Sequence, residues 1–392
     1  MPLKGVRVLD FGRYIAGPYC GALLADYGAD VIRIEGPAGN EDRFSVPVAE
    51  DGSGGMFLQM NRGKRCLTLK PGSEAGREIV RKLVATADVV IANMPDDALE
   101  KLGLDYPTLA ALNPRIILVT ASAFGSEGPL AQHVGFDAVG QAMSGAVYIG
   151  GKDGEPARAQ VNYVDFTTAL HCAFGVMLAL REREVTGVGQ RVSGSLLGTA
   201  LAITNGLTID HALNGIDRGM MGNRAFSSAP TDVFATRDGW IMTQVVGNPI
   251  FARWAALVGR PELADDPRFA SDILRGGHGA ELSAIMADWC APRTNAEALG
   301  ELGAAKVPAG AVLKPSEALA HPQVAATGVV DAMDYPGAHG PAPVVRTPIT
   351  LSASAKAAPV PAPQLGQDSA AILAEMGYDA AAISALREQR II

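Results

Sequence analysis

Asp165 is the residue of this sequence best placed for covalent chemistry. It opens an apolar run, Phe166 to Leu180, whose composition predicts a helix, and it follows Gly135-Phe136-Asp137 by about the length of one strand and loop. An Asp before a helical pattern is commonly an N-cap that accepts hydrogen bonds from the first turn. The partial positive charge at a helix N-terminus also keeps a carboxylate ionised, and an ionised carboxylate can attack an acyl carbon. Asp165 is compatible with both roles, and the neighbouring motifs must decide.

Length and charge restrict the possible partners. The chain has 392 residues, enough for two domains. Its composition, with 48% hydrophobic and 19% charged residues, is typical of a globular protein. The net charge of -8 argues against nucleic acid as a partner, since the longest basic run is Asn61-Arg-Gly-Lys-Arg65. Any anionic ligand must therefore be met by local positive charge.

Targeting, membrane and metal motifs were not found. No signal peptide is readable in the first residues, and no apolar run reaches the roughly 20 residues that a spanning helix needs. The cysteines are far apart, and the six His are scattered without an HExxH motif. We expect a cytoplasmic protein with reduced thiols, no membrane segment and no metal site; the cysteines are Cys20, Cys66, Cys172 and Cys290.

Strand-like and helix-like segments alternate in the first part of the chain. This alternation predicts an α/β fold, a parallel sheet with helices on its faces. The expected strands are Val6 to Phe11, Ala29 to Glu35, Asp88 to Asn93 and Arg115 to Thr120, and the expected helices are Gly17 to Tyr27 and Glu74 to Thr86.

A dinucleotide site is the first alternative for such a fold. Glu35 ends the second strand, where dinucleotide-binding folds carry an acidic residue that binds the ribose. The first strand-to-helix turn, Gly12 to Pro18, however, lacks the GxGxxG motif. Gly187-Val-Gly189 lacks the third glycine and follows a helix. The sequence therefore disfavours nicotinamide chemistry.

The second part of the chain predicts a smaller α+β domain. Thr231 to Val246 has hairpin character with Asp238-Gly239 as the turn, and helices are expected around Pro249 to Val258 and Gly279 to Cys290. The Pro-rich run from Ala357 should be extended, followed by a helical pair from Asp368 to Glu388. The expected division is a large domain over 1–200, a linker over 201–225, a small domain over 226–325, and a return to the large domain over 326–392.

With these segments in place, the chain resembles the class III CoA-transferases (CaiB/BaiF type), a family that includes the α-methylacyl-CoA racemases. The resemblance covers nearly the whole length. The order and spacing of the matching stretches carry it; these are Ala16 to Cys20, Leu23 to Glu35, Asn61 to Arg65, Leu102 to Leu104, Leu112 to Ile117, Phe124 to Pro129, Gln141 to Gly145, Thr186 to Gln190, Gly222-Asn223, Val307 to Gly310 and Leu365-Gly366.

The resemblance implies that Asp165 is the nucleophile. In such transferases the carboxylate attacks an acyl-CoA thioester to form a mixed anhydride, and the freed thiolate returns to form an aspartyl-CoA thioester. A carboxylic acid acceptor then reverses the sequence. Covalent catalysis of this kind conserves the acyl activation that hydrolysis would lose. Backbone N–H groups should stabilise the oxyanions, and the turns Gly150-Gly151 and Gly222-Asn223 are candidates for this.

The racemase branch is the close alternative. Its enzymes use a His and an Asp as two bases, and Phe136 occupies the slot of that His, while His133 is off register. Asn248 likewise stands where racemases tend to carry Glu. Since phenylalanine has no exchangeable proton, both departures favour transfer. A catalytically silent CoA-binding protein is the third possibility, and an assay of CoA exchange among acids would separate it from an enzyme.

Coenzyme A is expected as a substrate, bound by the large domain. Carrying the family pattern over by position, and adding basic residues for the phosphates, gives the candidates Arg33, Lys64, Arg65, Leu69, Lys70, Asn93, Met94, Lys101 and Phe136. Where the family often has Asn-Phe-Arg-Pro-Gly, this chain has Asn93-Met-Pro-Asp-Asp97, without the Arg and with two acids. Ile15 replaces a polar residue of some transferases, so the donor can differ. The resemblance also implies a Rossmann-like large domain built from both chain ends, a small inserted domain, and an interlocked homodimer.

Overall fold

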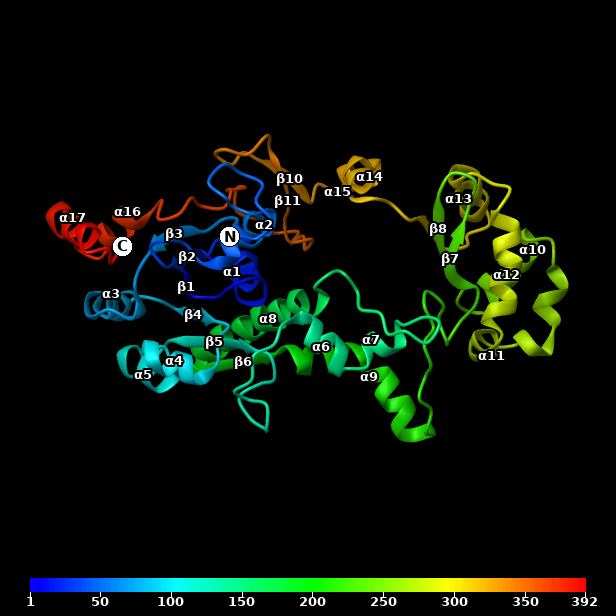
Figure 1. Ribbon diagram of the computed structural model, residues 1–392, viewed down its shortest axis with the longest axis horizontal. Coiled ribbons are helices and arrows are strands. Elements are labelled where there is room, and N and C mark those ends of the chain that lie inside the picture. Colours follow the sequence, from blue (N-terminus) through cyan, green and yellow to red (C-terminus); the bar gives the residue numbers. More distant parts are fainter. The chain divides into compact units, whose positions relative to one another are not determined.

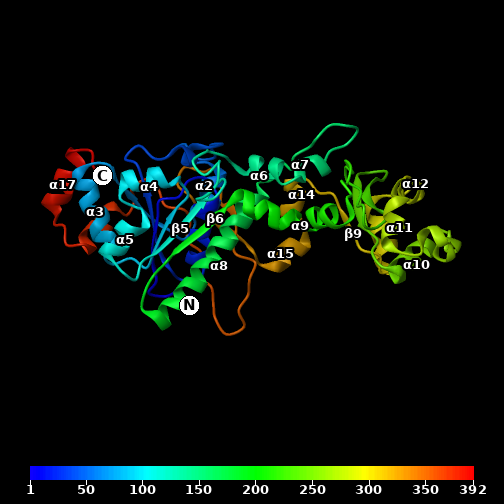
Figure 2. The ribbon, with the colours of Figure 1, turned by 90° about the horizontal axis from the view of Figure 1, so that it is seen from below.

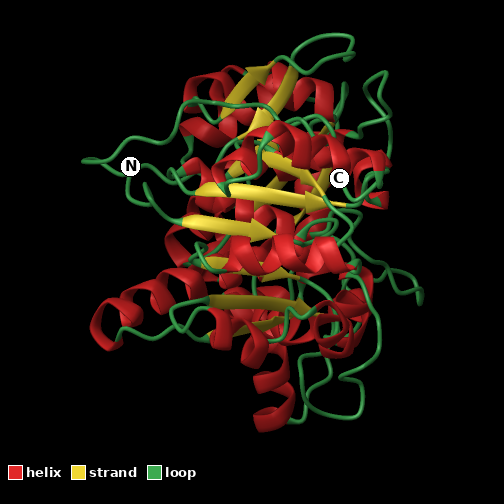
Figure 3. Ribbon diagram, turned by 90° about the vertical axis from the view of Figure 1, so that its left-hand side faces the viewer, coloured by secondary structure: helices red, strands yellow, loops and turns green.

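Six parallel strands form the central sheet, in the order β3-β2-β1-β4-β5-β6 (Figures 1 and 3). The computed structural model describes residues 1–392. The strands are β1 (Arg7–Asp10), β2 (Asp30–Glu35), β3 (Arg65–Thr68), β4 (Val89–Ala92), β5 (Ile117–Ser122) and β6 (Arg191–Ser195). The predicted strands correspond to β1, β2, β4 and β5, and the parallel sheet is confirmed. Strands β3 and β6 were not predicted.

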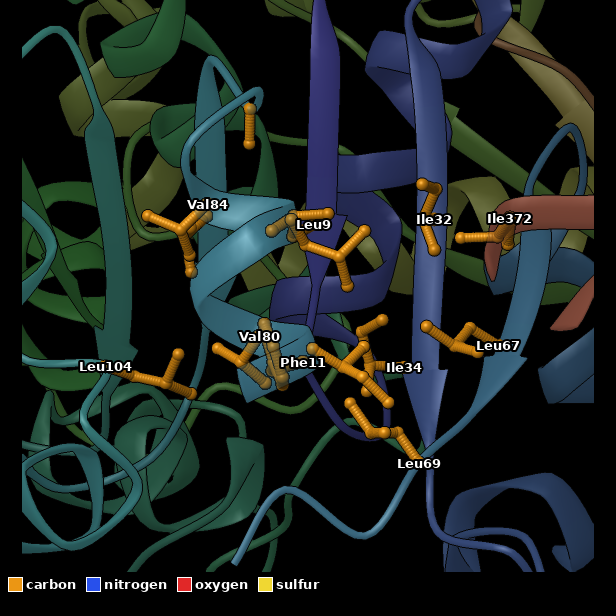
Figure 4. Close-up of a cluster of buried hydrophobic side chains, with 14 of the residues drawn as sticks. Leu9, Phe11, Ile32, Ile34, Leu67, Leu69, Val80, Val84, Leu104 and Ile372 are labelled. Atoms are coloured by element: carbon orange, nitrogen blue, oxygen red, sulfur yellow. The ribbon is translucent and has the colours of Figure 1, made fainter. Parts of the chain in front are cut away.

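Side chains alternate between the two faces of the sheet, and helices cover both. Leu9 and Ile32 point into one cluster (Figure 4), which also contains Leu118, while Val8, Val31 and Ile117 belong to the other. The first cluster lies under α3 (Glu74–Val84), α4 (Asp96–Leu102), α5 (Tyr106–Leu112), α16 (Ser369–Glu375) and α17 (Ala380–Glu388). The second lies under α1 (Ala16–Asp26) and α8 (Tyr163–Thr186), and Figure 2 shows α8 alongside β5 and β6.

The C-terminal segment completes the free edge of the sheet at β3. The amide of Cys66 donates to Asp368 Oδ2 at 2.8 Å, and the amide of Thr68 donates to Ser369 Oγ at 3.1 Å. These side chains satisfy edge donors that would otherwise be unpaired. Both ends of the chain therefore belong to one unit, as the resemblance implied.

Helix α8 is long and apolar enough to cross a membrane by length and composition, with 39% of its most apolar window buried. It is the one helix of the chain with that property, although no uninterrupted apolar run in the sequence reaches about 20 residues. Its buried side, which includes Ala169, Cys172 and Val176, packs on the sheet and on α1. Such packing is typical of the core helix of a globular unit.

The chain forms two compact units. The first contains Met1–Ser144, Gln160–Ile203 and Gln323–Ile392, and the second contains Gly145–Ala159 and Thr204–Pro322. The expected linker over 201–225 therefore belongs mostly to the second unit, which also takes a short excursion before α8. Besides the sheet and its helices, the first unit holds η1 (Glu41–Phe44), α2 (Gly55–Asn61), α6 (Asp137–Met143), β10 (Val330–Met333) and β11 (Ala342–Val345).

The second unit is built on an antiparallel sheet of β7 (Thr231–Ala235), β8 (Trp240–Gln244) and β9 (Ala309–Ala311). The predicted hairpin is confirmed, with Ala235 opposite Trp240 across the turn. Its core includes Phe251, Trp254 and Trp289. Its other elements are α7 (Ala146–Ile149), α10 (Asn248–Leu257), η2 (Pro261–Asp265), η3 (Pro267–Phe269), α11 (Asp272–Gly277), α12 (Gly279–Cys290), α13 (Asn295–Ala304) and α14 (Pro315–Ala320). Helices α9 (Leu196–Asn214) and α15 (Pro322–Thr327) join the two units along the chain.

Candidate active site

A pocket of about 400 Å³ lies in the first unit, where β1, β4 and β5 end. The strand order runs outward in opposite directions from β1 and β4, and ligands of such sheets bind at the carboxyl ends of the strands at this reversal. The carboxyl ends of the three strands and the loops that follow them contribute Tyr14, Asn93 and Ser122 among others. The whole lining is Arg13 to Ala16, Asn93 to Pro95, Ala98, Leu102, Ala121 to Ala123, His133 to Phe136, Asp165 and Leu196.

Asp165 is the carboxylate of this pocket. It is the third residue of α8, and only 9% of its surface is exposed. Its backbone amide is bonded, but its side-chain oxygens accept no hydrogen bond from another residue of the chain. A carboxylate at a helix N-terminus with free lone pairs is available to react with a molecule in the pocket.

Asp137, rather than Asp165, caps α8. Its Oδ2 accepts hydrogen bonds from the amides of Val164 at 2.8 Å and Asp165 at 3.0 Å, and its Oδ1 accepts from Gln141 Nε2. The helix begins at Tyr163, so Asp165 stands inside the first turn, and its side chain accepts no hydrogen bond from the amides of that turn. The N-cap interpretation of Asp165 is therefore wrong. The capping carboxylate comes from α6 because the tertiary fold brings residue 137 to this helix end.

Two largely buried carboxylates thus lie close together. Burial, and secondly the charge of Asp137, raise the pKa of Asp165 from 3.8 to about 7. A carboxylate with a pKa near neutrality is more basic than an exposed one, and a strongly perturbed carboxyl group in a cleft is typical of functional sites. Asp137 meanwhile accepts three hydrogen bonds, from two backbone amides and a glutamine side chain.

The turn after β1 forms another wall of the pocket. Tyr14 has a φ of 60°, in the left-handed region that non-glycine residues rarely adopt. Asn93, at the end of β4, holds the turn: its Oδ1 accepts from Arg13 N at 2.6 Å and its Nδ2 donates to Arg13 O at 2.7 Å. The Tyr14 ring meets Phe136 edge to face, with centroids 5.5 Å apart. Three separate loops are thereby joined around one cavity.

Comparison with known proteins decides the family. The model of CoA-transferase family III matches residues 3–369. The chain belongs to CoA-transferase family III. It is 34% identical to a succinate–glutarate CoA-transferase of Agrobacterium fabrum, over 96% of each protein. It is 36% identical to a succinyl-CoA–D-citramalate CoA-transferase of Chloroflexus aurantiacus, over 82% of this chain and 81% of the relative.

A solved structure agrees with this assignment. A CaiB/BaiF family protein from Brucella suis superposes with a TM-score of 0.84 at 34% identity, covering 96% of this chain and 99% of the other. The recognition of a CaiB/BaiF-type family III CoA-transferase from the sequence is therefore confirmed, and its mixed α/β fold with it.

The structure brings only some of the expected CoA-binding residues of this family III chain together. Asn93, Met94 and Phe136 line the pocket with Asp165. Lys101 is 76% exposed at its side chain on α4, beside the pocket residue Leu102, and makes only a 3.3 Å ion pair with Asp97. Lys70 is exposed just beyond β3, at the same edge of the sheet.

The other candidates do not line the pocket, and their side chains are either buried or paired within the fold. Arg33 and Lys64 are fully buried, the first paired with Asp42 and the second with Asp10. Arg65 begins β3, at the amino edge opposite the pocket, and pairs with Asp30 and Glu375. Leu69 is a core residue with no exposed surface. Basic residues of the Asn61–Arg65 run were expected at the ligand, but their charges are already used within the fold.

The glycine turns considered for oxyanion stabilisation also have other uses. The amide of Gly222 donates to Gly151 O at 2.8 Å, and the amides of Gly150 and Gly151 donate to Ala146 and Tyr148. These N–H groups are therefore occupied within the second unit. No group of three His, Cys, Asp or Glu side chains is arranged to hold a metal ion.

Several pocket residues were missed by reasoning from the sequence. Asp137 was noted only as the neighbour of Phe136, and Arg13, Ser122 and His133 were not proposed for the site. Ser122 could have been found, since it stands at the carboxyl end of a predicted strand. His133 lies in a loop, and only the fold shows that it reaches the pocket.

Proposed function

We propose that this protein transfers CoA from an acyl-CoA thioester to a free carboxylic acid, with Asp165 as the covalent nucleophile. The observation that carries this proposal is the Asp165 carboxylate itself, which lines the pocket with no hydrogen-bond partner and a raised pKa. Family III membership and the CoA-transferase names of the relatives support it. The six-stranded parallel sheet would then serve as a Rossmann-like CoA-binding domain.

The first half of the proposed reaction loads the enzyme. One Asp165 oxygen attacks the thioester carbonyl, the C–S bond breaks, and CoA leaves as the thiolate, so a mixed anhydride remains on Asp165. The thiolate then attacks the aspartyl carbonyl and releases the donor acid as its carboxylate. Asp165 is now an aspartyl-CoA thioester.

The second half repeats these steps with the acceptor. Its carboxylate attacks the aspartyl thioester and releases the thiolate, and the thiolate attacks the acceptor side of the new anhydride. The products are the new acyl-CoA and the free Asp165 carboxylate. One thioester is consumed and one is formed, so no proton, water or external energy source is needed.

The acceptor in this proposal is a dicarboxylic acid. The names of the relatives include succinate, glutarate and citramalate, each of which carries a second carboxylate. Arg13, whose side chain is 51% exposed, lines the pocket and could pair with that group, since guanidinium binds carboxylate in a bidentate manner. Glu41 lies 3.3 Å away and would have to release it. A donor such as formyl-CoA, the substrate of the formyl-CoA transferases that the chain also resembles, carries no second carboxylate for Arg13 to bind.

Racemisation of an α-methylacyl-CoA is the second candidate, favoured by one observation. His133 lines the same pocket as Asp165, although it is not in the position of the racemase histidine. Phe136 occupies that position, is 62% exposed and carries no proton to exchange. Transfer therefore remains the better proposal, and isotope exchange separates the two.

We further propose that the protein acts as a homodimer. Leu170, Phe174 and Leu178 recur at intervals of four residues along α8, with exposed fractions of 45%, 63% and 55%. An apolar stripe of this kind on a helix surface is typical of a face that another chain covers. Sedimentation of the wild type and of Phe174→Glu tests this, because a stable dimer in both would assign the interface elsewhere.

The decisive experiment traps the covalent intermediate. The protein is incubated with succinyl-CoA, treated with hydroxylamine and digested, and the peptide containing Asp165 is examined by mass spectrometry for a hydroxamate. Incubation with free CoA is the control, and Asp165→Ala should show neither hydroxamate nor exchange. A hydroxamate on another carboxylate, with full activity in Asp165→Ala, would refute the mechanism. Binding of CoA without any exchange would identify a silent binding protein.

A further inference from the structure

Beneath the turn after β1, Lys64 and Asp10 form an ion pair without solvent contact. Lys64 Nζ lies 2.7 Å from Asp10 Oδ2, and both side chains have no exposed surface. The same ammonium donates to Pro18 O at 2.7 Å and to Asn61 Oδ1 at 2.9 Å. All three of its hydrogens are therefore used, and they join β1, the first turn of α1 and the end of α2.

The second oxygen of Asp10 extends this contact into the turn. Asp10 Oδ1 accepts a hydrogen bond from the amide of Gly12 at 2.8 Å. From the opposite side, Arg33 donates to the carbonyl oxygen of Gly12. A Cβ at residue 12 would lie 2.8 Å from Asp10 Oδ1 and 2.9 Å from Pro18, so only glycine fits there. The peptide groups on both sides of Gly12 are thus held by buried charges.

This arrangement supports a conformation that the chain would otherwise avoid. Tyr14, two residues further on, has a φ of 60°, which is strained for a residue with a side chain and persists only where the surroundings over-determine it. Asn93 holds Arg13 between the two. The strained residue and its neighbours Arg13 and Ile15 line the pocket that contains Asp165.

Stability alone does not explain a buried lysine at this point. Taking an ammonium and a carboxylate out of water costs about as much as their attraction returns, and an apolar pair is often as stable. We propose that Lys64 and Asp10 are positioning residues, which hold the Gly12–Ala16 turn in the geometry that binds the acyl-CoA thioester. This inference rests on the proposed CoA transfer, and neither residue touches the substrate.

The ammonium of Lys64 also makes the Lys64–Asp10 ion pair, called the clamp below, sensitive to pH. Burial lowers its pKa from 10.5 to about 8, although Asp10 opposes this shift. The other ionisable groups facing it are Arg33, Arg62 and the thiol of Cys20, whose pKa burial raises well above its usual value so that it stays neutral. Above pH 8 Lys64 therefore becomes an amine with one donor fewer, and the turn should loosen.

The test combines kinetics with hydrogen exchange at the turn. In Lys64→Met we expect the KM for succinyl-CoA to rise about tenfold or more, since three hydrogen bonds from a charged donor are lost. The amides of the Gly12–Ala16 peptide should exchange faster. Arg183→Met is the matched control, because it also removes a buried cation, paired with Asp88 at 2.8 Å, but at the amino edge of the sheet. It should change neither readout.

A folded Lys64→Met protein with the wild-type KM and wild-type exchange would overturn the inference. If that variant does not fold, the wild type itself decides: between pH 7 and pH 9.5 its KM for succinyl-CoA should rise and the turn should lose protection beyond the intrinsic effect of pH. Constant KM and protection over this range would also overturn it. If the wild type transfers no CoA between any acids, the proposed function fails, whereas the exchange data still report on the clamp.

Discussion

Replacing Asp165 by Asn should abolish CoA transfer and at the same time stabilise the folded protein at pH 8. The nucleophilic oxygen is lost, so activity disappears. The stability gain follows from the raised pKa, because the folded protein must hold an ionised carboxylate in a site that favours the protonated form. Asparagine keeps nearly the same shape without that charge, and α8 keeps its cap because the cap is Asp137.

The size of the gain depends on pH. The pKa of Asp165 rises from 3.8 in an exposed chain to about 7 in the fold, and each unit corresponds to about 1.36 kcal/mol. A folded-state pKa above the unfolded value means that the folded state binds more protons between these limits, so stability falls as the pH rises from about 4 to 7. Removing the group should therefore raise the free energy of unfolding by about 4 kcal/mol at pH 8, about 2 kcal/mol at pH 5 and less than about 1 kcal/mol at pH 4.

Urea unfolding at these three pH values measures the effect, with Asp26→Asn as the contrasting variant. Asp26 is also buried, but hydrogen bonds and charge from Arg62 outweigh the effect of burial and lower its pKa. Its ionised form therefore contributes stability above the unfolded pKa, and Asp26→Asn should destabilise the protein at pH 8. Two results would refute the proposed environment of Asp165. One is an Asp165→Asn variant that is less stable than the wild type at pH 8; the other is a change in the free energy of unfolding that is the same at all three pH values.

Three further predictions concern the same pocket. Asp137→Asn removes the second cause of the raised pKa, so the acidic limb of kcat/KM, which reports ionisation of Asp165, should move to lower pH; an unchanged limb would leave burial as its sole cause. Because Phe136 has no exchangeable proton, a 2-methylacyl-CoA incubated with the protein in deuterium oxide should take up α-deuterium much more slowly than CoA is transferred. Uptake as rapid as transfer would favour the isomerase. Lys101→Ala should raise the KM for acyl-CoA severalfold while Arg65→Ala should not, since only Lys101 lies exposed beside the pocket; equal KM values in both variants would assign Lys101 to the solvated surface.

Much of the fold could be predicted from the sequence because its cause is local. The strands β1, β2, β4 and β5 are apolar runs with clear limits, and α3 carries its own cap, Ser73, whose side chain accepts from Gly76 N at 3.1 Å. The hairpin turn at Asp238-Gly239 is likewise set by neighbouring residues. Edge strand β3 could not be found in this way, because its partners are β2 and the C-terminal segment.

For the site, the sequence by itself predicted Asp165 as the reactive group, from the order and spacing of the motifs around it. Only the tertiary structure decided what surrounds that group. Residues 137 and 165 are separated by a long excursion along the chain, and burial, together with the nearby charge of Asp137, raises the pKa of Asp165. Composition shows a basic run at Asn61 to Arg65 but not where its charges point. Lys64 is buried and paired with Asp10 on a strand distant in sequence, so its charge is not available to a ligand.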